Sequence, residues 1–139
     1  MNEKKFFYDF GRAIYHVDAV YEDFAKESGV AATLLWILYA LNDGENHTQR
    51  EICTEWELPK STVNTITTEL KKNGYVELIP IKGKRREMTI VLTDSGKKYA
   101  DDMLKPLYKK EAKVFKLLSA EDRQVIEKLE KIVTLLRED

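Results

Sequence analysis

The 139-residue sequence is poor in residues that mark disulfide-rich, fibrous and zinc-binding proteins: it has one cysteine, two histidines, three prolines and six glycines. The lone Cys53 excludes an internal disulfide, and the few glycines and prolines exclude collagen-like and low-complexity chains. The longest apolar run, residues 30–41, spans only about 18 Å as a helix, too short for a bilayer. Because the first residues also lack the apolar stretch of a signal peptide, we expect a cytoplasmic protein with no membrane partner.

The sequence also offers little material for catalysis. Apart from Cys53, metal binding or nucleophilic chemistry would rest on His16 and His47, and no Cys/His spacing suits zinc. We expect His47 to be solvated and His16 to lie at an interface. Cys53 is expected to pack inward as a small hydrophobic residue, with a redox-active thiol as the alternative. The sequence therefore predicts no enzyme, no cofactor and no metal site.

Charge is abundant, at 34% of the residues, and it is unevenly distributed. Residues 1–59 carry 5 basic and 11 acidic side chains, residues 60–98 carry 9 and 4, and residues 99–139 carry 9 of each. A net charge of −1 thus conceals a basic middle segment. Positive charge attracts polyanions over about 8–10 Å in physiological salt, so the segment 60–98 is a candidate contact surface for nucleic acid.

Hydrophobic periodicity predicts a mainly helical chain. Apolar residues recur at helical spacing from Phe6 to Phe24, and the run 30–41 is apolar on all sides, as in a central helix that is covered all round. A further long helix begins after Thr93 and contains Pro106, where we expect a kink. A last helix opens at residues 119–122.

Two short helices joined by a tight turn are predicted in the middle of the chain. The first opens with the capping-box spacing of Thr48 and Glu51 and stops before Pro59. The second runs from about residue 60 to 73 and ends at Gly74. Their inward-facing residues are expected to be Ile52, Cys53, Trp56, Val63, Ile66 and Leu70.

A basic hairpin follows the two short helices. Residues 75–81 and 87–92 are rich in β-branched and apolar side chains, and the glycine-containing connection 82–86 has hairpin length. Pro80 cannot donate a ladder hydrogen bond, so its strand is predicted to lie at a sheet edge. Two helices and a basic hairpin in this order describe a winged helix-turn-helix, the fold class expected here: mainly α with a small β-hairpin wing.

In such a fold the second helix enters the major groove of DNA and the wing lies beside the duplex. Asn64 suits bidentate contact with adenine, and lysines at the helix ends suit phosphates. The candidate DNA-binding residues are Lys60, Ser61, Thr62, Asn64, Thr65, Thr68, Lys71 and Lys72 on the helix, and Lys82, Lys84, Arg85 and Arg86 on the wing.

Over essentially its whole length the sequence resembles the MarR family of bacterial transcriptional regulators. The resemblance rests on residues 58–63 (LPKSTV), 70–76 (LKKNGYV) and 91–96 (VLTDSG) and on the order of the helices. It implies one domain, residues 1–139. Residues of about 30–98 form the winged core, and dimerisation helices lie at about 3–28 and 99–138.

The resemblance also implies a homodimer that binds a pseudo-palindromic operator and responds to a small aromatic or anionic effector. The apolar stripes of the terminal helices independently favour dimerisation. Candidate effector-binding residues are Tyr8, Arg12, Tyr15, Trp36 and Tyr39. Two positions depart from the family pattern: Lys84 replaces the usual wing aspartate, which makes the tip more positive, and Thr65 replaces a common arginine.

We therefore expect sequence-specific binding of double-stranded DNA by a homodimeric, ligand-responsive repressor. The alternative is a winged-helix module that binds protein and has no affinity for DNA. Arg86 and the basic segment favour the first interpretation.

Overall fold

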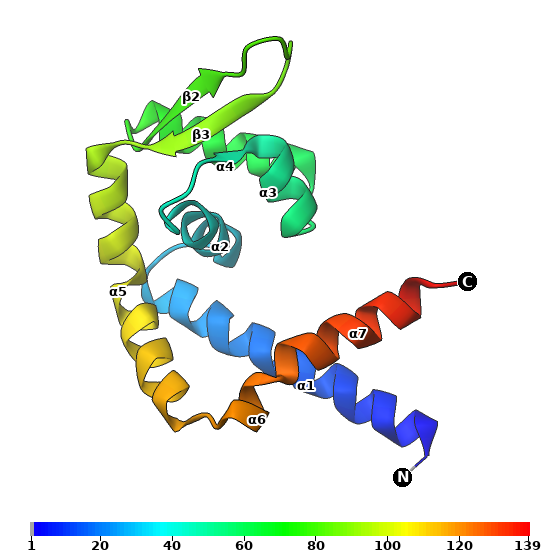
Figure 1. Cartoon of the computed structure of the whole chain (residues 1–139). Coiled ribbons are helices and arrows are strands. Elements are labelled where there is room, and N and C mark those ends of the chain that lie inside the picture. The colour runs from blue at the N-terminus through cyan, green and yellow to red at the C-terminus, as the bar shows by residue number, and fades with distance from the viewer. Residues whose placement is uncertain (1) are drawn as a thin grey trace. The chain divides into compact units, whose positions relative to one another are not determined.

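The computed structural model describes residues 2–139 and divides the chain into two compact units, a first unit that ends at Lys105 and a second unit, Pro106–Asp139. The first unit contains α1 (Glu3–Glu27), α2 (Ala32–Leu41), β1 (His47–Thr48), α3 (Gln49–Glu55), α4 (Lys60–Lys72), β2 (Val76–Pro80), β3 (Met88–Leu92) and the start of α5 (Asp94–Leu117). The second unit contains the rest of α5, then α6 (Ala120–Arg123) and α7 (Val125–Arg137). Figure 1 shows these elements.

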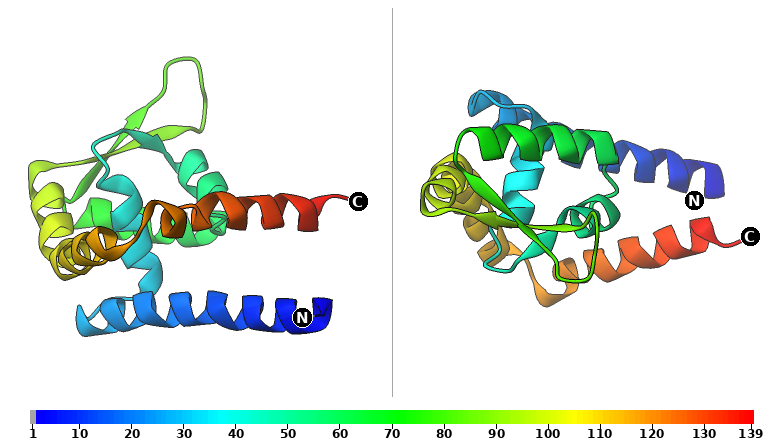
Figure 2. Two further views of the ribbon diagram at one scale, coloured as in Figure 1. Left: turned by 60° about the horizontal axis from the view of Figure 1, so that its bottom comes forward. Right: turned by 90° about the horizontal axis from the view of Figure 1, so that it is seen from above.

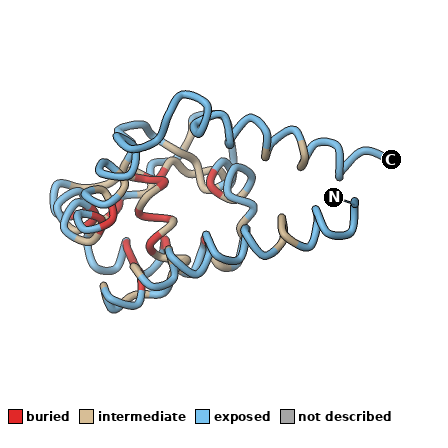
Figure 3. Tube along the Cα trace, turned by 90° about the horizontal axis from the view of Figure 1, so that it is seen from below, coloured by how far each residue is buried: buried red, intermediate tan, exposed pale blue. Residues whose placement is uncertain are grey.

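The core of the first unit is built around α2, the helix that is apolar on all sides. Its residues Leu35, Ile37 and Leu38 are at most 1% exposed. Other elements of this unit supply further buried side chains, namely Ile52 of α3, Val63 of α4, Ile90 of β3 and Leu104 of α5. In contrast, the helical tubes that lead to the two chain termini are exposed or intermediate along nearly their whole length (Figure 3). Several large apolar side chains of α1, and several of α7, are therefore exposed.

The helix-turn-helix formed by α3 and α4 follows the predicted boundaries closely. The Thr48 hydroxyl accepts a hydrogen bond from the Glu51 N–H at 3.0 Å, which caps α3. The Glu51 carboxylate, expected to complete the capping box, instead lies 3.8 Å from His47 Nδ1. The turn contains Glu57 at φ 48°, a left-handed conformation that glycine usually supplies.

Trp56 is an exception to the predicted burial of α3. It forms the C-cap of the helix and is 36% exposed, so the prediction that α3 buries it was wrong. The Trp56 ring instead contacts the rings of Trp36 and Tyr39 at centroid distances of 5.4 and 6.4 Å.

The wing is a β-hairpin formed by β2 and β3 (Figure 1). With β1 on the other side of β3, the hairpin completes a small antiparallel sheet of order β1-β3-β2. Val76 pairs with Leu92 and Pro80 pairs with Met88, so the prediction that Pro80 lies on an edge strand is confirmed. The third strand, β1, pairs His47 with Ile90 and was not predicted, because two residues are too short to show periodicity. Figure 2 shows the connection between β2 and β3 extending beyond the neighbouring helices.

The junction between α4, β2 and α5 is closely packed. Gly74, at φ 76°, ends α4, and the Thr93 hydroxyl donates to its carbonyl oxygen at 2.6 Å. The same hydroxyl accepts from the Gly96 N–H at 3.0 Å, which confirms Thr93 as the cap of α5. Gly96 is buried directly against the carbonyl group of Tyr75.

The second unit begins at Pro106, through which α5 continues. Ser119 and Asp122 form a complete capping box at the start of α6, where the sequence predicted a helix to open. The single predicted last helix is divided, because the Gln124 N–H bonds to the Glu121 carbonyl three residues back. The large exposed apolar residues of this unit are Val114, Phe115, Leu117, Leu118, Val125, Ile126, Leu135 and Leu136.

Candidate nucleic-acid interface

Helix α4 has one buried face and one polar exposed face. Val63 and Leu70 are buried as predicted, whereas Ile66 is only partly covered. Thr67, 1% exposed, completes the inner face and was missed because it is polar. The candidate residues Lys60, Ser61, Asn64, Thr65, Thr68, Lys71 and Lys72 are exposed, and Thr62 is partly exposed. The outward placement of the candidate contact residues is therefore observed.

Two threonines on this face use their hydroxyl protons within the helix. The Thr65 hydroxyl donates to the Ser61 carbonyl at 2.9 Å, and the Thr68 hydroxyl donates to the Asn64 carbonyl at 2.8 Å. A hydroxyl bonded in this way keeps its acceptor lone pairs but has no proton for a base. The Asn64 side chain carries two N–H donors and one carbonyl acceptor. It is therefore better suited than these two threonine hydroxyls to pair with the edge of a base.

A cavity of about 360 Å³ lies between α3, α4 and the base of the wing. It is lined by Gln49, Arg50, Cys53, Thr54, Lys60, Val63, Asn64, Arg86 and Glu87. The structure thus brings Arg86 of the wing to the same cavity as Lys60 and Asn64 of α4. The cavity combines the Asn64 side-chain amide with cations from α3, α4 and the wing.

The other candidate cations lie away from this cavity. Lys71 and Lys72 occupy the last turn of α4, where positive charge is favourable to the helix dipole. Lys71 follows Lys60 by eleven positions, which corresponds to about 16 Å along a helix axis. Lys82 and Arg85 are exposed on the wing connection. Contacts with two separate stretches of a phosphate backbone would therefore suit this arrangement.

The wing is closed by backbone and side-chain contacts. The Lys84 N–H donates to the Ile81 carbonyl at 3.1 Å, with Gly83 at φ 82° in the turn. The Lys84 ammonium lies 3.1 Å from the Glu87 carboxylate, and the Arg50 guanidinium of α3 lies 3.5 Å from it. Lys84 therefore adds less positive charge to the tip than the sequence suggested.

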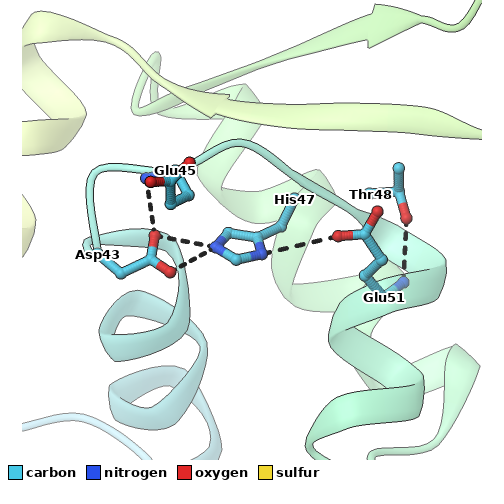
Figure 4. Close-up of polar contacts among 5 residues, drawn as sticks. All are labelled: Asp43, Glu45, His47, Thr48 and Glu51. Atoms are coloured by element: carbon cyan, nitrogen blue, oxygen red, sulfur yellow. Dashed lines mark hydrogen bonds and ion pairs between the residues drawn. The ribbon is translucent and has the colours of Figure 1, made fainter.

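A histidine network connects α2 with α3 at the entrance of the helix-turn-helix (Figure 4). His47 Nε2 lies 2.8 and 2.9 Å from the two oxygens of Asp43, and Nδ1 lies 3.8 Å from Glu51. Partial burial raises the pKa of Asp43, but hydrogen bonds from His47 and from the Glu45 N–H outweigh it and hold this pKa below its usual value. The expectation of a solvated His47 was wrong, since its side chain is only 14% exposed.

Cys53 is less enclosed than expected, because it is partly exposed and lines the cavity beside α4. Its neighbour Ile52, in contrast, is fully buried. Within residues 2–139 no group of three or more His, Cys, Asp and Glu side chains is arranged to hold a metal ion. His16 lies on the exposed surface of α1.

The five candidate effector residues form two separate groups within one chain. Trp36 and Tyr39 are in ring contact with each other at 5.6 Å, and Tyr21 covers Trp36 at 4.6 Å. Tyr8 is 67% and Tyr15 is 75% exposed, and the Arg12 guanidinium lies 5.9 Å from the Tyr8 ring. Tyr8 precedes Tyr21 by thirteen residues, about 20 Å along the axis of α1. One chain alone does not bring all five together.

Across the described part of the chain, no single helix is both long and apolar enough to cross a membrane. The consecutive helices α1 and α2 meet the length and composition requirement only when counted together, and the chain bends by 92° between them.

The helix pair α3–α4 and the adjacent wing define the molecule as a winged helix-turn-helix protein. Comparison with protein families gives a match to the MarR family over residues 28–87, the segment that contains these elements. The winged region of the chain therefore matches the MarR family, which supports the family prediction. Comparison with curated proteins found no significant sequence match.

Solved structures extend the similarity of fold to the whole chain. A MarR family regulator from Neisseria meningitidis, NMB1585, superposes with a TM-score of 0.83 at 24% identity, covering 98% of this chain and 94% of its own. AbfR of Staphylococcus epidermidis superposes with a TM-score of 0.77 at 20% identity, covering 99% of this chain and 97% of its own. AbfR has also been solved bound to DNA. NadR in complex with 4-hydroxyphenylacetate superposes with a TM-score of 0.73 at 14% identity, covering 94% of this chain and 92% of its own. The chain thus has the fold of MarR-family transcriptional regulators.

Proposed function

We propose that this protein binds double-stranded DNA sequence-specifically as a homodimer and acts as a ligand-responsive, non-enzymatic repressor in the cytoplasm. The observation that carries the proposal is the convergence of Lys60 and Asn64 of α4 with Arg86 of the wing on one cavity. A recognition helix in the major groove and a wing along the backbone would use this arrangement directly. AbfR, which shares the fold, has been solved on DNA.

The direct test is a salt series of binding titrations with the full chain and a fluorescent mixed-sequence duplex of about 25 base pairs. Phosphate contacts release counterions, so log affinity should fall linearly with log salt. Absence of binding at low salt would contradict the proposal and favour the alternative, a winged-helix module that binds protein.

Arg86→Ala is expected to weaken duplex binding and to flatten its salt dependence. Each lost phosphate contact reduces the magnitude of the slope of log affinity against log salt by about 0.9. A dimer that loses one contact in each chain should therefore show a slope smaller in magnitude by about 1.8. Lys105→Ala is the matched control, because Lys105 is exposed on α5 and outside the cavity. Equal salt slopes for Arg86→Ala and the wild type would show that Arg86 does not contact the backbone.

The homodimer is supported by the uncovered apolar stripes of the terminal helices. In α1, Phe6, Phe7, Ile14, Val17 and Val20 are between 39% and 57% exposed. Contiguous apolar surface of this kind is typical of an obligate interface. Two chains of 16.2 kDa should therefore give a particle of about 32 kDa at micromolar concentration. Light scattering that reports a monomer at this concentration would contradict the proposal.

We propose that the protein also binds a small aromatic or anionic effector. NadR, which shares the fold, has been solved with 4-hydroxyphenylacetate. The candidate residues on α1 and α2 lie in two groups, so we propose that a site formed by all five requires both chains of the dimer. Such a site would couple effector binding to the relative position of the two winged regions.

A further inference from the structure

Glu87 places a carboxylate in the middle of the basic surface where the wing meets α3. It is the last residue before β3, and its backbone carbonyl accepts from the Ile81 N–H at 3.4 Å. Its side chain is 21% exposed and contacts Lys84 at 3.1 Å and Arg50 at 3.5 Å. The hydrogen bond from Lys84, followed by the contacts with Arg50, holds the pKa of Glu87 below its usual value, so the carboxylate is ionised at neutral pH.

The surroundings of Glu87 are those expected of a bound anion. Among the residues that line the 360 Å³ cavity in the described chain, Arg50, Lys60 and Arg86 supply positive charge and Glu87 supplies the only carboxylate. Glu87 and Arg50 also line a second cavity of about 480 Å³ between α3 and the wing, together with Lys84 and with the carboxylates of Glu51 and Glu55, which belong to α3. Carboxylates and phosphates accept hydrogen bonds from the same cations in similar geometries.

The two cations that pair with Glu87 remain largely exposed to solvent. The Arg50 and Lys84 side chains are 79% and 62% exposed, and exposed ion pairs of this kind are weak. A duplex that brings phosphates to both cations can therefore replace the carboxylate. A duplex that brings a phosphate to only one of these cations, or that places a phosphate beside Glu87, is repelled by the negative charge of the Glu87 carboxylate.

We propose that Glu87 is a specificity-determining residue for DNA: in the free protein its carboxylate takes the place of a backbone phosphate between Arg50 and Lys84. This inference rests on the proposed function. Both cations exchange the carboxylate for phosphate oxygens when the duplex is correctly seated. Glu87 thereby lowers affinity for wrongly seated, non-specific duplexes more than affinity for the preferred sequence.

The test is Glu87→Gln, which removes the charge and nearly preserves the shape. On a mixed-sequence duplex its affinity should rise about three- to tenfold, with a salt slope steeper by about one unit for each released cation. On a duplex chosen by selection from a random pool the gain should be smaller, so the ratio of specific to non-specific affinity should fall. Glu77→Gln is the matched control, since Glu77 is exposed on β2 of the same hairpin and pairs across the sheet with Val91. It should change non-specific affinity much less.

A second variant separates the phosphate-substitute role from a purely structural one. In a Lys84→Met background, Glu87→Gln should give a smaller gain, because one of the two held cations is absent. If Glu87→Gln binds the mixed duplex no more tightly than the wild type, or with an unchanged slope, Glu87 only braces the wing and the inference is wrong. If the wild type binds no duplex at any salt, the proposed function itself fails.

Discussion

Replacing Gly96 with alanine is expected to lower the free energy of unfolding by about 3 kcal/mol or more, because a Cβ at this position has no space. It would overlap the carbonyl oxygen of Tyr75, a backbone atom rather than the end of a flexible side chain. That carbonyl accepts from the Thr93 N–H at 3.0 Å, and the Tyr75 N–H bonds to the Leu70 carbonyl at 2.9 Å. Relief of the overlap therefore requires α5 to move away from the end of α4.

Urea unfolding followed by circular dichroism measures this effect, with Gly11→Ala as the control. Gly11 lies inside α1, and a Cβ there has no atom within 4 Å. Alanine should therefore stabilise that helix by about 0.5–1 kcal/mol. A loss below about 1 kcal/mol for Gly96→Ala would contradict the close packing of α5 on Tyr75, since overlap with a backbone atom costs more.

Replacing Asn64 with alanine is expected to cost about 1–3 kcal/mol on the preferred duplex and to relax specificity at one position of each half-site. Asn64 is exposed on α4, lines the cavity shared with Arg86, and presents an amide that matches the adenine edge. On mixed-sequence DNA the same variant should bind nearly as well as the wild type, because base contacts add little to non-specific affinity.

Lys71→Ala provides the contrasting control for Asn64→Ala. Lys71 lies in the last turn of α4, about eleven residues beyond the start of the helix, and suits a phosphate rather than a base. Its loss should weaken all duplexes nearly equally. Competition titrations with preferred and mixed-sequence duplexes distinguish the two patterns. A uniform loss with Asn64→Ala would show that Asn64 positions the helix without reading a base.

Features that depend on local periodicity were predictable from the sequence. The apolar spacing of Val63 and Leu70 predicted the buried face of α4, and the strands of the wing were predicted to within one residue at each end. Thr67 has the same spacing, four residues after Val63 and three before Leu70, and was missed because threonine rarely fills a core position.

Features that depend on residues distant in the sequence were not predictable. Glu87 contacts Lys84 three residues away, which helix or hairpin spacing can suggest, but its contact with Arg50 spans 37 residues. The two-residue strand β1 exists only because β3 pairs with it. His47 looked solvated because neither Asp43 nor Glu51 can be placed around its ring before the turn after α2 is known.

The measurement that tests the central claim most directly is a binding selection from a pool of randomised duplexes, carried out in parallel with wild type and Asn64→Ala. Two-fold symmetry of the proposed dimer predicts a pseudo-palindromic preference for the wild type, with half-sites about 10 base pairs apart. The Asn64→Ala pool should lose preference at one base pair in each half-site and keep it elsewhere. No enriched sequence, or the same non-palindromic preference for both proteins, would contradict the claim that α4 of a symmetric dimer reads DNA.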